Sequence, residues 1–295
     1  MGTVAIIGGT GFVGRSLIGV LRSHDKEAKI RLLSRSSPRT AIPGVEWQKA
    51  DIRESSSLEK ALEGCSIVYY LPGILTETRE QTYEDVHAKG VIATLKALSG
   101  HTISRFILVS AIGASLHAPS AYHRTKKMGE EALIESGRPF TIVRPSLVFG
   151  EGDRSISQFL SLGTSLHILP VIGPGTAKVQ PVYSGDLAAL LAIIPMNPDA
   201  QGKVYEVGGP RIYTYREMME SIRRSAHLKA LIVSFPTPLM MLAASFQKRL
   251  LPRPFLTPDV VRMALADNVT DRNAPVVDFG MSLVSLESWL ESKKE

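Results

Sequence analysis

Gly8-Gly9-Thr10-Gly11-Phe12-Val13-Gly14 follows the apolar run Thr3-Val4-Ala5-Ile6-Ile7, and this junction decides the fold. A buried strand followed by glycines at positions 8, 11 and 14 is the pattern of a βα turn that binds a dinucleotide. The first glycine allows a tight turn, the second lets the backbone approach a pyrophosphate, and the third lets the helix pack on the strand. The phosphates then meet the free N–H groups at the helix N-terminus. The cofactor contacts expected in this turn are Gly8, Thr10, Gly11, Phe12, Val13 and Gly14.

A phosphate-binding P-loop is the alternative interpretation of these glycines. Gly9 to Ser16 has the P-loop spacing, but Arg15 stands where a P-loop requires lysine. The planar guanidinium does not imitate the compact lysine charge on the β- and γ-phosphates. The sequence also lacks an apolar strand ending in the aspartate that would hold Mg²⁺. We therefore favour the dinucleotide turn.

Short β-rich runs alternate with helical patterns along residues 1–150. Several runs are almost continuously apolar, as expected for parallel strands covered on both faces. Gly64, Gly100 and Gly137 each stand where a helix would end in a left-handed cap. The alternation predicts an α/β fold with a doubly wound parallel sheet, the Rossmann arrangement, as the NAD(P)-binding domain. The expected strands are Thr3–Ile7, Ile30–Ser34, Val45–Ala50, Ile67–Leu71, Arg105–Ser110 and Phe140–Arg144, with helices at Glu59–Leu62, Val91–Leu98 and Lys127–Ile134.

Residues 151–295 show a weaker alternation, interrupted by prolines and glycines. We predict that they form a smaller, partly helical lobe over the carboxyl ends of the strands, which serves a substrate or partner. A segment of this half, about 177–210, is expected to return to the Rossmann sheet. The expected strands are Val179–Tyr183 and Val204–Val207, and the expected helices are Gly185–Ile194, Tyr215–Ala226 and Pro258–Ala266.

The composition fits an ordinary globular protein, because 44% of the 295 residues are hydrophobic and 21% are charged. The single cysteine, Cys65, excludes an internal disulfide framework and is expected to be buried. The seven histidines are scattered without the spacing of metal ligands, so we expect no metal site. A nucleic-acid partner is not expected either.

The sequence carries no recognisable export signal. The N-terminus runs directly into the first strand, with neither a charged n-region nor a small-residue cleavage site. The longest uncharged stretch, Ala230–Phe246, is short for a membrane span and contains Pro236 and Pro238. We expect a cytoplasmic protein, or one that lies peripherally on the inner face of a membrane.

The net charge of +6 is concentrated in one region. Residues 211–253 contain eight basic and two acidic side chains, which accounts for the whole surplus. Such a region meets an anionic substrate, an acidic partner or a membrane surface, or is simply a solvated helix face. Within it, the apolar Leu239–Phe246 is followed by Gln247–Leu251, which has two basic residues. We expect this helix to be buried in its own protein, with docking on a partner or a membrane surface as the alternative.

The end of the second strand bears on the choice between NAD(H) and NADP(H). An acid about twenty residues beyond the glycine turn would bind the ribose 2′-hydroxyl and select NAD. The strand instead ends Leu32-Leu33-Ser34-Arg35-Ser36. Arg35 and Arg15 match the oxygens of a 2′-phosphate and Ser34 supplies a hydroxyl, whereas on the alternative interpretation Arg35 is an ordinary surface residue. NADP(H) is therefore favoured over NAD(H).

Further motifs recur in order along nearly the whole chain. They are Gly8–Gly14, Ala50–Arg53, Val109–Ala111, Tyr122–Lys126, Arg144–Gly150, Pro181–Asp186, Tyr205–Pro210 and Leu256–Asp259. In these motifs the chain resembles the short-chain dehydrogenase/reductase superfamily, in its extended or atypical, epimerase/dehydratase-like form. The later motifs look most like the subgroup that contains the NAD(P)H-binding accessory subunit of complex I and its bacterial relatives.

The resemblance implies more cofactor contacts and a brace between the two halves of the chain. Asp51 and Ile52 would flank the adenine, and Asp186 would brace the junction to the lobe. The contacts implied beyond the fourth strand are Leu71, Pro72 and Gly73, and those implied near the nicotinamide are Pro145, Ser146, Leu147 and Val148.

Tyr122 and Lys126 are four residues apart and therefore lie on one face of a helix. In the superfamily that the chain resembles, the tyrosine is the general acid/base, and the lysine lowers its pKa and holds the nicotinamide ribose. A phenol with a pKa of about 10 is a poor base at neutral pH unless a nearby cation favours the phenolate. The resemblance thus assigns both residues to catalysis and to cofactor contact.

The catalytic serine of the superfamily has no counterpart in register. It would lie about two residues beyond Ser110, where this chain has Ile112. Ser110 is retained as the candidate hydroxyl donor and cofactor contact, with Ser115 and Ser120 as more distant substitutes. A missing hydroxyl removes a hydrogen bond that would polarise a substrate carbonyl.

Two hypotheses of function follow. In the first, the chain is an NADP-dependent oxidoreductase or isomerase that acts on a small carbonyl or alcohol through the Tyr122–Lys126 pair. In the second, it is a non-catalytic, NADPH-binding accessory or assembly subunit of a respiratory NADH:quinone oxidoreductase-type complex. The retained pair favours the first hypothesis, which we prefer by a small margin. The resemblance to the complex I subgroup, Ile112 and the basic C-terminal lobe favour the second. The basic, apolar C-terminal lobe is also where we expect any contact with a respiratory complex or a membrane.

Overall fold

The computed structural model describes residues 2–38, 40–252 and 254–293, and its centre is a sheet of seven parallel strands. The strand order is β11-β6-β5-β4-β1-β2-β3, so the order reverses between β1 and β4. A crevice outside the carboxyl ends of strands at such a reversal is where open α/β sheets bind ligands. The strands are β1 Thr3–Ile7, β2 Ile30–Ser34, β3 Val45–Lys49, β4 Cys65–Tyr70, β5 Arg105–Val109, β6 Phe140–Pro145 and β11 Lys203–Val207.

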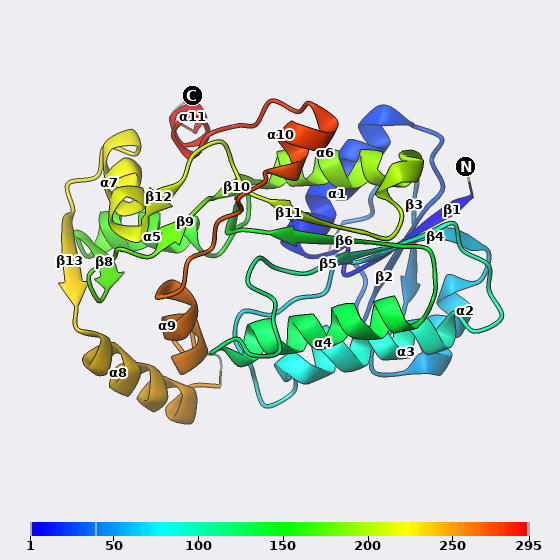
Figure 1. Ribbon diagram of the computed structural model, residues 1–295, viewed down its shortest axis with the longest axis horizontal. Helices are drawn as coiled ribbons and strands as arrows, with labels where there is room; N and C mark the ends of the chain where they lie inside the picture. Colours follow the sequence, from blue (N-terminus) through cyan, green and yellow to red (C-terminus); the bar gives the residue numbers. More distant parts are fainter. Residues whose placement is uncertain (1, 39, 253, 294–295) are drawn as a thin grey trace.

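Helices cover both faces of this sheet, which confirms the predicted doubly wound fold (Figure 1). Successive side chains of a strand point to opposite faces, so Ile6 joins one buried core and Ile7 the other. The first core is closed by helices α1 and α6, and the second by α2, α3 and α4. The helices are α1 Phe12–His24, α2 Ser55–Leu62, α3 Gly90–Ala97, α4 Ala121–Glu135 and α6 Ser184–Ile193.

The lobe lies beside the carboxyl ends of the central strands and has a buried core of its own (Figure 1). A parallel pair of strands, β8 Ile168–Ile172 and β13 Leu231–Phe235, lies at its outer edge (Figure 1). The helices of the lobe are α5 Ile156–Ser165, α7 Tyr215–Ser225, α8 Thr237–Leu250, α9 Pro258–Ala264 and α11 Leu286–Ser292, whereas α10 Ala274–Phe279 packs through Phe279 on the first core of the sheet. The shorter pieces are β7 Val148–Phe149, β9 Lys178–Val179, β10 Val182–Tyr183 and β12 Tyr213–Thr214, the π-helix η1 Asp85–Lys89, and the 3₁₀ turns η2 Ile194–Met196 and η3 Pro198–Ala200.

The six predicted strands of the first half are confirmed to within two residues at each end. The left-handed helix ends are confirmed as well, with φ of 71°, 83° and 67° at Gly64, Gly100 and Gly137. The predicted strand Val179–Tyr183 is instead two short pieces, β9 and β10, and the β8–β13 pair was not predicted. Cys65 is buried, as expected.

The prediction that the apolar helix is buried in its own protein is wrong. Leu239–Phe246 lies within α8, and Ala244 is the buried residue of that helix, whereas Leu242 is 69% exposed and Phe246 is 66% exposed. Apolar content alone does not distinguish a core helix from one that offers its apolar side to the surface. Among the described residues, no helix combines the length and hydropathy that a membrane span requires.

The glycine turn brings helix α1 close to strand β1. A Cβ on Gly14 would lie 2.4 Å from the Cα of Gly9 and 2.8 Å from the carbonyl oxygen of Gly8. Gly8 has a φ of +79°, which favours glycine, and a Cβ there would lie 3.1 Å from the nitrogen of Pro72. Gly9, which the spacing argument passed over, is equally constrained, because its Cβ would lie 2.3 Å from the Cδ1 of Leu32. The turn therefore has room for backbone only.

We expect Gly14→Ala to lower the free energy of unfolding by about 1–3 kcal/mol, because backbone atoms cannot move aside for the new methyl group. Gly19→Ala in the same helix is the matched control. A Cβ on Gly19 meets nothing within 4 Å, so this change should raise stability by up to about 1 kcal/mol through helix propensity. Urea unfolding of both variants measures the difference, and equal effects would contradict the packing argument.

Candidate functional site

The glycine turn leaves the N-terminus of α1 open to an anion. The N-cap residue is Gly11, which has no side chain that could cap the helix. The first turn of the helix contains no acidic residue. The N–H groups of a first helical turn have no partner within the helix, and they carry the positive end of its dipole. Phosphate oxygens fit this position, so the residues present suit a dinucleotide.

The end of β2 gathers hydroxyl and guanidinium groups. The Ser34 hydroxyl donates to the Ser36 carbonyl at 2.8 Å and accepts from the Trp47 indole N–H at 3.0 Å. Arg35 is exposed and close enough to contribute to the lowered pKa of Asp51. The main cause of that low pKa is Arg53, whose Nε and Nη2 lie 3.0 and 2.6 Å from the two carboxylate oxygens. The Asp51 carboxylate is therefore already held by a cation.

The Arg15 guanidinium lies beside a different segment, the loop at Gly152. Its Nη2 lies 2.7 Å from the point that a Cβ of Gly152 would occupy. Arg15 is exposed on the first turn of α1, and the loop at Gly150–Gly152 follows strand β7. The two arginines thus flank the glycine turn from different sides, with Arg35 beside Asp51 and Arg15 beside Gly152.

The carboxyl ends of β4 and β5 meet helix α4 at Lys126. The Lys126 ammonium donates to the Val109 carbonyl at 3.0 Å, and it lies 3.4 Å from the Cβ position of Gly73. Pro72 in turn lies against Gly8 of the glycine turn. The predicted cofactor contacts from the turn, from β4 and from α4 are therefore neighbours along one continuous surface.

Ser110 supplies a second sign that this surface is built for a ligand. Its hydroxyl is buried, with the residue 3% exposed, and has no hydrogen-bond partner among the described residues. An unsatisfied buried hydroxyl costs about 1–3 kcal/mol, so native proteins rarely keep one without a reason. Ser110 follows Val109, the residue whose carbonyl holds Lys126, so a bound cofactor fits beside both.

Tyr122 lies in a cluster of aromatic rings. The ring centroids of His87 and His123 are each 5.1 Å from that of Tyr122, and Tyr83 is 5.9 Å away, all with edge-on geometry. The Lys126 Nζ is 6.0 Å from the Tyr122 ring centroid. The spacing argument did not find Tyr83, His87 or His123, because they come from other segments or have no motif of their own.

The pKa of Tyr122 shifts in the direction opposite to the one expected for a lysine-activated phenol. Burial raises the pKa of Tyr122 to about 12. Burial also lowers the pKa of the Lys126 ammonium to about 8, although the Glu130 carboxylate opposes part of that shift. At neutral pH this Tyr122 is a protonated phenol, which is able to give a proton rather than take one.

His87 fixes the loop after β4 against α4. Its Nε2 accepts from the Ile74 N–H at 3.2 Å, so Nδ1 carries the proton and donates to the Thr125 hydroxyl at 3.1 Å. Burial lowers the pKa of His87 well below its ordinary value, which keeps the ring neutral. His87 lies on the π-helix η1, and such segments often mark functional sites.

Ile112 occupies the expected serine position as a buried apolar residue, 5% exposed, whose N–H donates to the Pro145 carbonyl at 3.1 Å. The alternative hydroxyl of Ser120 is already engaged. Ser120 is the N-cap of α4, where it accepts from the His123 N–H and lies 2.7 Å from the His123 Nδ1. Among the nearby serines named above, Ser110 is therefore the one with a buried hydroxyl to spare.

The segment after β6 ties the sheet to the C-terminal chain. The Ser146 hydroxyl donates to the Asn268 carbonyl at 2.7 Å and accepts from the Gln180 N–H at 3.3 Å. Leu147 packs on the lobe core and Val148 on the α1–α6 core. These contacts hold the segment in place beside Pro145. In the same way, the Asp186 carboxylate accepts from the Val284 N–H at 2.7 Å and braces the lobe.

The remaining implied cofactor contacts lie at the carboxyl edge of the sheet. Ile52 follows Asp51 beyond β3 and packs against the second core, and Leu71 directly follows β4 and packs against the first. Among the described residues, no group of three or more metal-ligating side chains is found.

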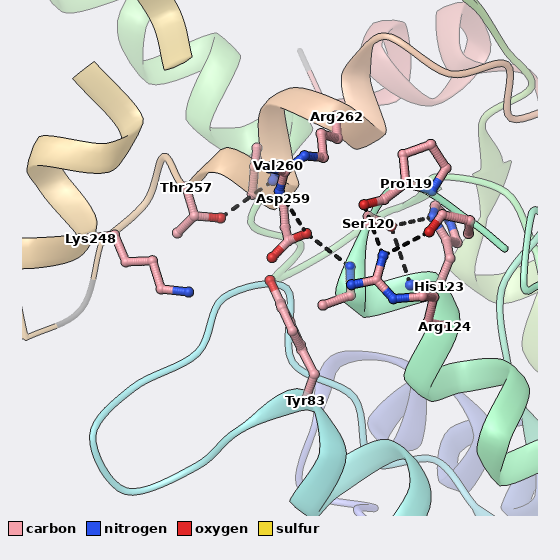
Figure 2. Close-up of polar contacts among 12 residues, drawn as sticks. Tyr83, Pro119, Ser120, His123, Arg124, Lys248, Thr257, Asp259, Val260 and Arg262 are labelled. Carbon is pink, nitrogen blue, oxygen red and sulfur yellow. Dashed lines mark hydrogen bonds and ion pairs between the residues drawn. The ribbon is translucent and has the colours of Figure 1, made fainter. Parts of the chain in front are cut away.

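The C-terminal lobe reaches the helix that carries Tyr122 and Lys126. Asp259, on α9, accepts the Ala121 N–H at 2.9 Å, so its carboxylate caps the first turn of α4 (Figure 2). A carboxylate is favoured at a helix N-terminus by the dipole as well as by the hydrogen bond. In the second half of α4, the buried Glu130 carboxylate binds Arg144 of β6 through two hydrogen bonds of 2.8 and 2.6 Å. Helix α4 is therefore held from both the lobe and the sheet.

Comparison with known proteins agrees with this site. The profile of a family described as NAD(P)H-binding matches residues 8–164. The chain belongs to this family. The relatives below also confirm the resemblance to the complex I subgroup, and the solved structures below share the fold of an epimerase.

Three relatives carry informative names. Mitochondrial NADH dehydrogenase (ubiquinone) 1 alpha subcomplex subunit 9 of Arabidopsis thaliana is 31% identical over 88% of this chain and 67% of its own length. The subunit of the same name from Dictyostelium discoideum is 32% identical, and the match spans 62% of that protein. Ceramide reductase of Caulobacter vibrioides is 28% identical over 83% of this chain and 77% of its own length.

Solved structures share the fold at low sequence identity. The NADPH complex of an Escherichia coli NADPH-dependent quinone oxidoreductase has a TM-score of 0.78 at 17% identity, covering 99% of this chain and all of that one. A nucleoside-diphosphate-sugar epimerase of Staphylococcus aureus also has a TM-score of 0.78, at 16% identity. The match extends through the lobe, so the whole chain follows this architecture.

We expect Lys126→Met to raise the free energy of unfolding at about pH 7 by about 1–2 kcal/mol, because an apolar residue replaces a buried cation. The folded-state pKa of Lys126, about 8, lies below its ordinary value, so the unfolded chain binds more protons above pH 8. The stability of the parent therefore rises relative to the variant as pH increases from about 8 to about 10.5. Urea unfolding at both ends of this range measures the difference, and an advantage that grows with pH would contradict the argument.

Proposed function

We propose that the chain is an NADP(H)-dependent oxidoreductase or isomerase that acts on a carbonyl or alcohol substrate. The observation that carries this proposal is the Lys126 ammonium beside Gly73, on the surface that continues from the glycine turn, with the buried Ser110 hydroxyl, which has no partner among the described residues, next in the chain to the Val109 carbonyl that holds Lys126. A buried donor without a partner and a buried lysine together suit a polar ligand that satisfies both. The name of the ceramide reductase relative supports reductase chemistry.

The proposed roles follow from the protonation states. NADPH, when bound, supplies the hydride. Tyr122, whose pKa is raised to about 12 by burial, is protonated at neutral pH and gives its Oη proton to the substrate oxygen during reduction. Lys126 holds the nicotinamide ribose, and the Ser110 hydroxyl donates a hydrogen bond. Ile112 and the neighbouring aromatic rings keep water from this part of the site.

NADP(H) is the proposed cofactor because the exposed Arg35 directly follows β2, and because Arg53 already holds Asp51. A guanidinium beside the end of β2 attracts a 2′-phosphate and has no equivalent partner on a 2′-hydroxyl. The NADPH complex of the structural neighbour is consistent with this choice.

We expect Arg35→Ala to weaken NADPH binding by about 10- to 100-fold while leaving NADH binding nearly unchanged, since a charge-assisted hydrogen bond contributes about 1.5–3 kcal/mol. Lys60→Ala, an exposed basic residue on α2, is the control for a general charge effect. Isothermal titration with both cofactors measures the ratio. Equal losses for NADPH and NADH would show that Arg35 does not read the 2′-phosphate.

A second candidate function is that of a non-catalytic, cofactor-bound accessory or assembly subunit. The specific observation in its favour is the buried Ile112 at the serine position. The mitochondrial relatives are named as subunits of a respiratory dehydrogenase, so contact with such a complex belongs to this candidate. In this role the cofactor contributes structure rather than hydride.

A measurement of NADPH oxidation distinguishes the two candidate functions. The protein is purified, the cofactor that accompanies it is identified by absorbance, and bound NADPH is offered a panel of carbonyls and quinones. We expect oxidation of NADPH that falls by about 10²- to 10⁴-fold in Tyr122→Phe, which removes the proton donor and keeps the ring. Tight but inert NADPH would favour the accessory candidate, and turnover that survives Tyr122→Phe would overturn the assigned proton donor.

A further inference from the structure

Helix α8 presents an apolar face to solvent. Four residues spaced three or four apart share this face, and two apolar residues beyond the helix are exposed as well. The exposed fractions are 53% for Leu239, 69% for Leu242, 66% for Phe246, 58% for Leu250, 44% for Leu251 and 59% for Phe255. Apolar residues are common singly on protein surfaces, but a continuous group of this kind marks an interaction site.

The opposite side of α8 is firmly attached to the protein. Ala244 is fully buried, and it packs in a small core with Leu256 and with Val261 of α9. Met240 and Met241 line the same core. The exposed face therefore belongs to an ordered helix whose other side is already satisfied.

The charged residues of the segment that carries this face are all basic, and one of them, Lys248, pairs with the Glu77 carboxylate. Residues 230–258 contain no aspartate or glutamate, and their charged residues are Lys248, Arg249 and Arg253, the last of which lies outside the described residues. Lys248 and Arg249 are exposed on the last turn of α8. A partner that covers this face must accept apolar side chains and positive charge together.

We propose that α8 docks in the interface of an anionic lipid bilayer, with its apolar face inserted and its axis along the surface. Basic amphipathic helices bind such surfaces through the apolar area that they bury and through attraction to anionic headgroups. A second copy of the chain is the alternative occupant of this face, and it is distinguished by the oligomeric state in the test below. The proposal does not depend on whether the site turns over.

The docking face and the candidate site are connected by a short series of contacts. The Lys248 ammonium lies 3.1 Å from one Glu77 carboxylate oxygen, and the other accepts from the Tyr83 N–H at 3.1 Å. Tyr83 packs edge-on against Tyr122, while Asp259 caps α4 from the helix next to α8 (Figure 2). A bilayer that covers α8 thus lies against the outside of the aromatic cluster.

Vesicle flotation of the full chain tests the proposal. The vesicles contain phosphatidylcholine alone or with about one third phosphatidylglycerol. We expect binding to the anionic vesicles that is at least about tenfold stronger than to the neutral ones and that weakens as salt rises from about 0.1 M to about 0.5 M. The double variant Leu242→Ser/Phe246→Ser should lose at least about tenfold in binding, and Arg249→Gln about fivefold.

The matched control is Met196→Ser/Val277→Ser, which removes two apolar side chains that are 63% and 60% exposed elsewhere. It should bind the anionic vesicles as the parent does. Circular dichroism and thermal unfolding of every variant confirm that the folds are equal, which surface positions permit.

A fluorescence measurement reports insertion directly. The sole cysteine, Cys65, is buried, so an environment-sensitive dye on Phe246→Cys labels α8 selectively. Its emission should shift to shorter wavelength with anionic vesicles, whereas a dye on Met196→Cys should not respond. Equal binding to neutral vesicles, no binding at all, equal binding by the double variant, or a dimer in sedimentation that Leu242→Ser/Phe246→Ser dissolves would each overturn the proposal.

Discussion

The close approach of helix α1 to strand β1 is the constraint on which the rest of the structure depends. The Gly14 and Gly9 backbones leave no room for a side chain between them, and Gly8 lies against Pro72. Because the helix starts directly against the strand, its N-terminus lies at the point where the strand order reverses. The same constraint sets the distance from the turn to the end of β4, and hence to Lys126.

Helix α4 then completes the site, and it is held at several points that differ in chemistry. Asp259 and Ser120 satisfy its N-terminus, while the buried Glu130–Arg144 pair fixes its second half to β6. A buried ion pair is weak evidence for stability, because the desolvation of both charges offsets much of the attraction. Its value here is orientational, since a rotation of α4 would separate the two hydrogen bonds and move Tyr122 and Lys126 together.

The sequence predicted those parts of the fold and site that depend on local spacing. Glycines at fixed separations, apolar runs and a tyrosine four residues before a lysine all act within one turn or one strand, so a single sequence reveals them. The approach of Asp259 to Ala121 joins residues 138 apart, and that of His87 to Thr125 joins residues 38 apart. Such contacts arise from tertiary packing, which leaves no periodic signal.

Helix α8 is a second feature that the sequence alone could not predict. Its composition fits a core helix and a docking helix equally well, and the two differ only in whether other elements of the chain cover it. The sheet could not cover it, because both faces of the sheet are already closed by α1 and α6 and by α2, α3 and α4. Burial of an apolar helix is therefore a property of the whole arrangement rather than of the segment.

The pKa shifts of the site also result from burial by the surrounding elements. Burial lowers the pKa of Lys126 and raises that of Tyr122, so it disfavours the charged form of each group and works against a phenolate. A ligand that supplies hydrogen-bond partners to Lys126 and to the unpartnered Ser110 hydroxyl would relieve part of this cost. Such a ligand would recover part of the desolvation cost as binding free energy, and this is the physical argument that supports the proposed position of the cofactor between the glycine turn and α4.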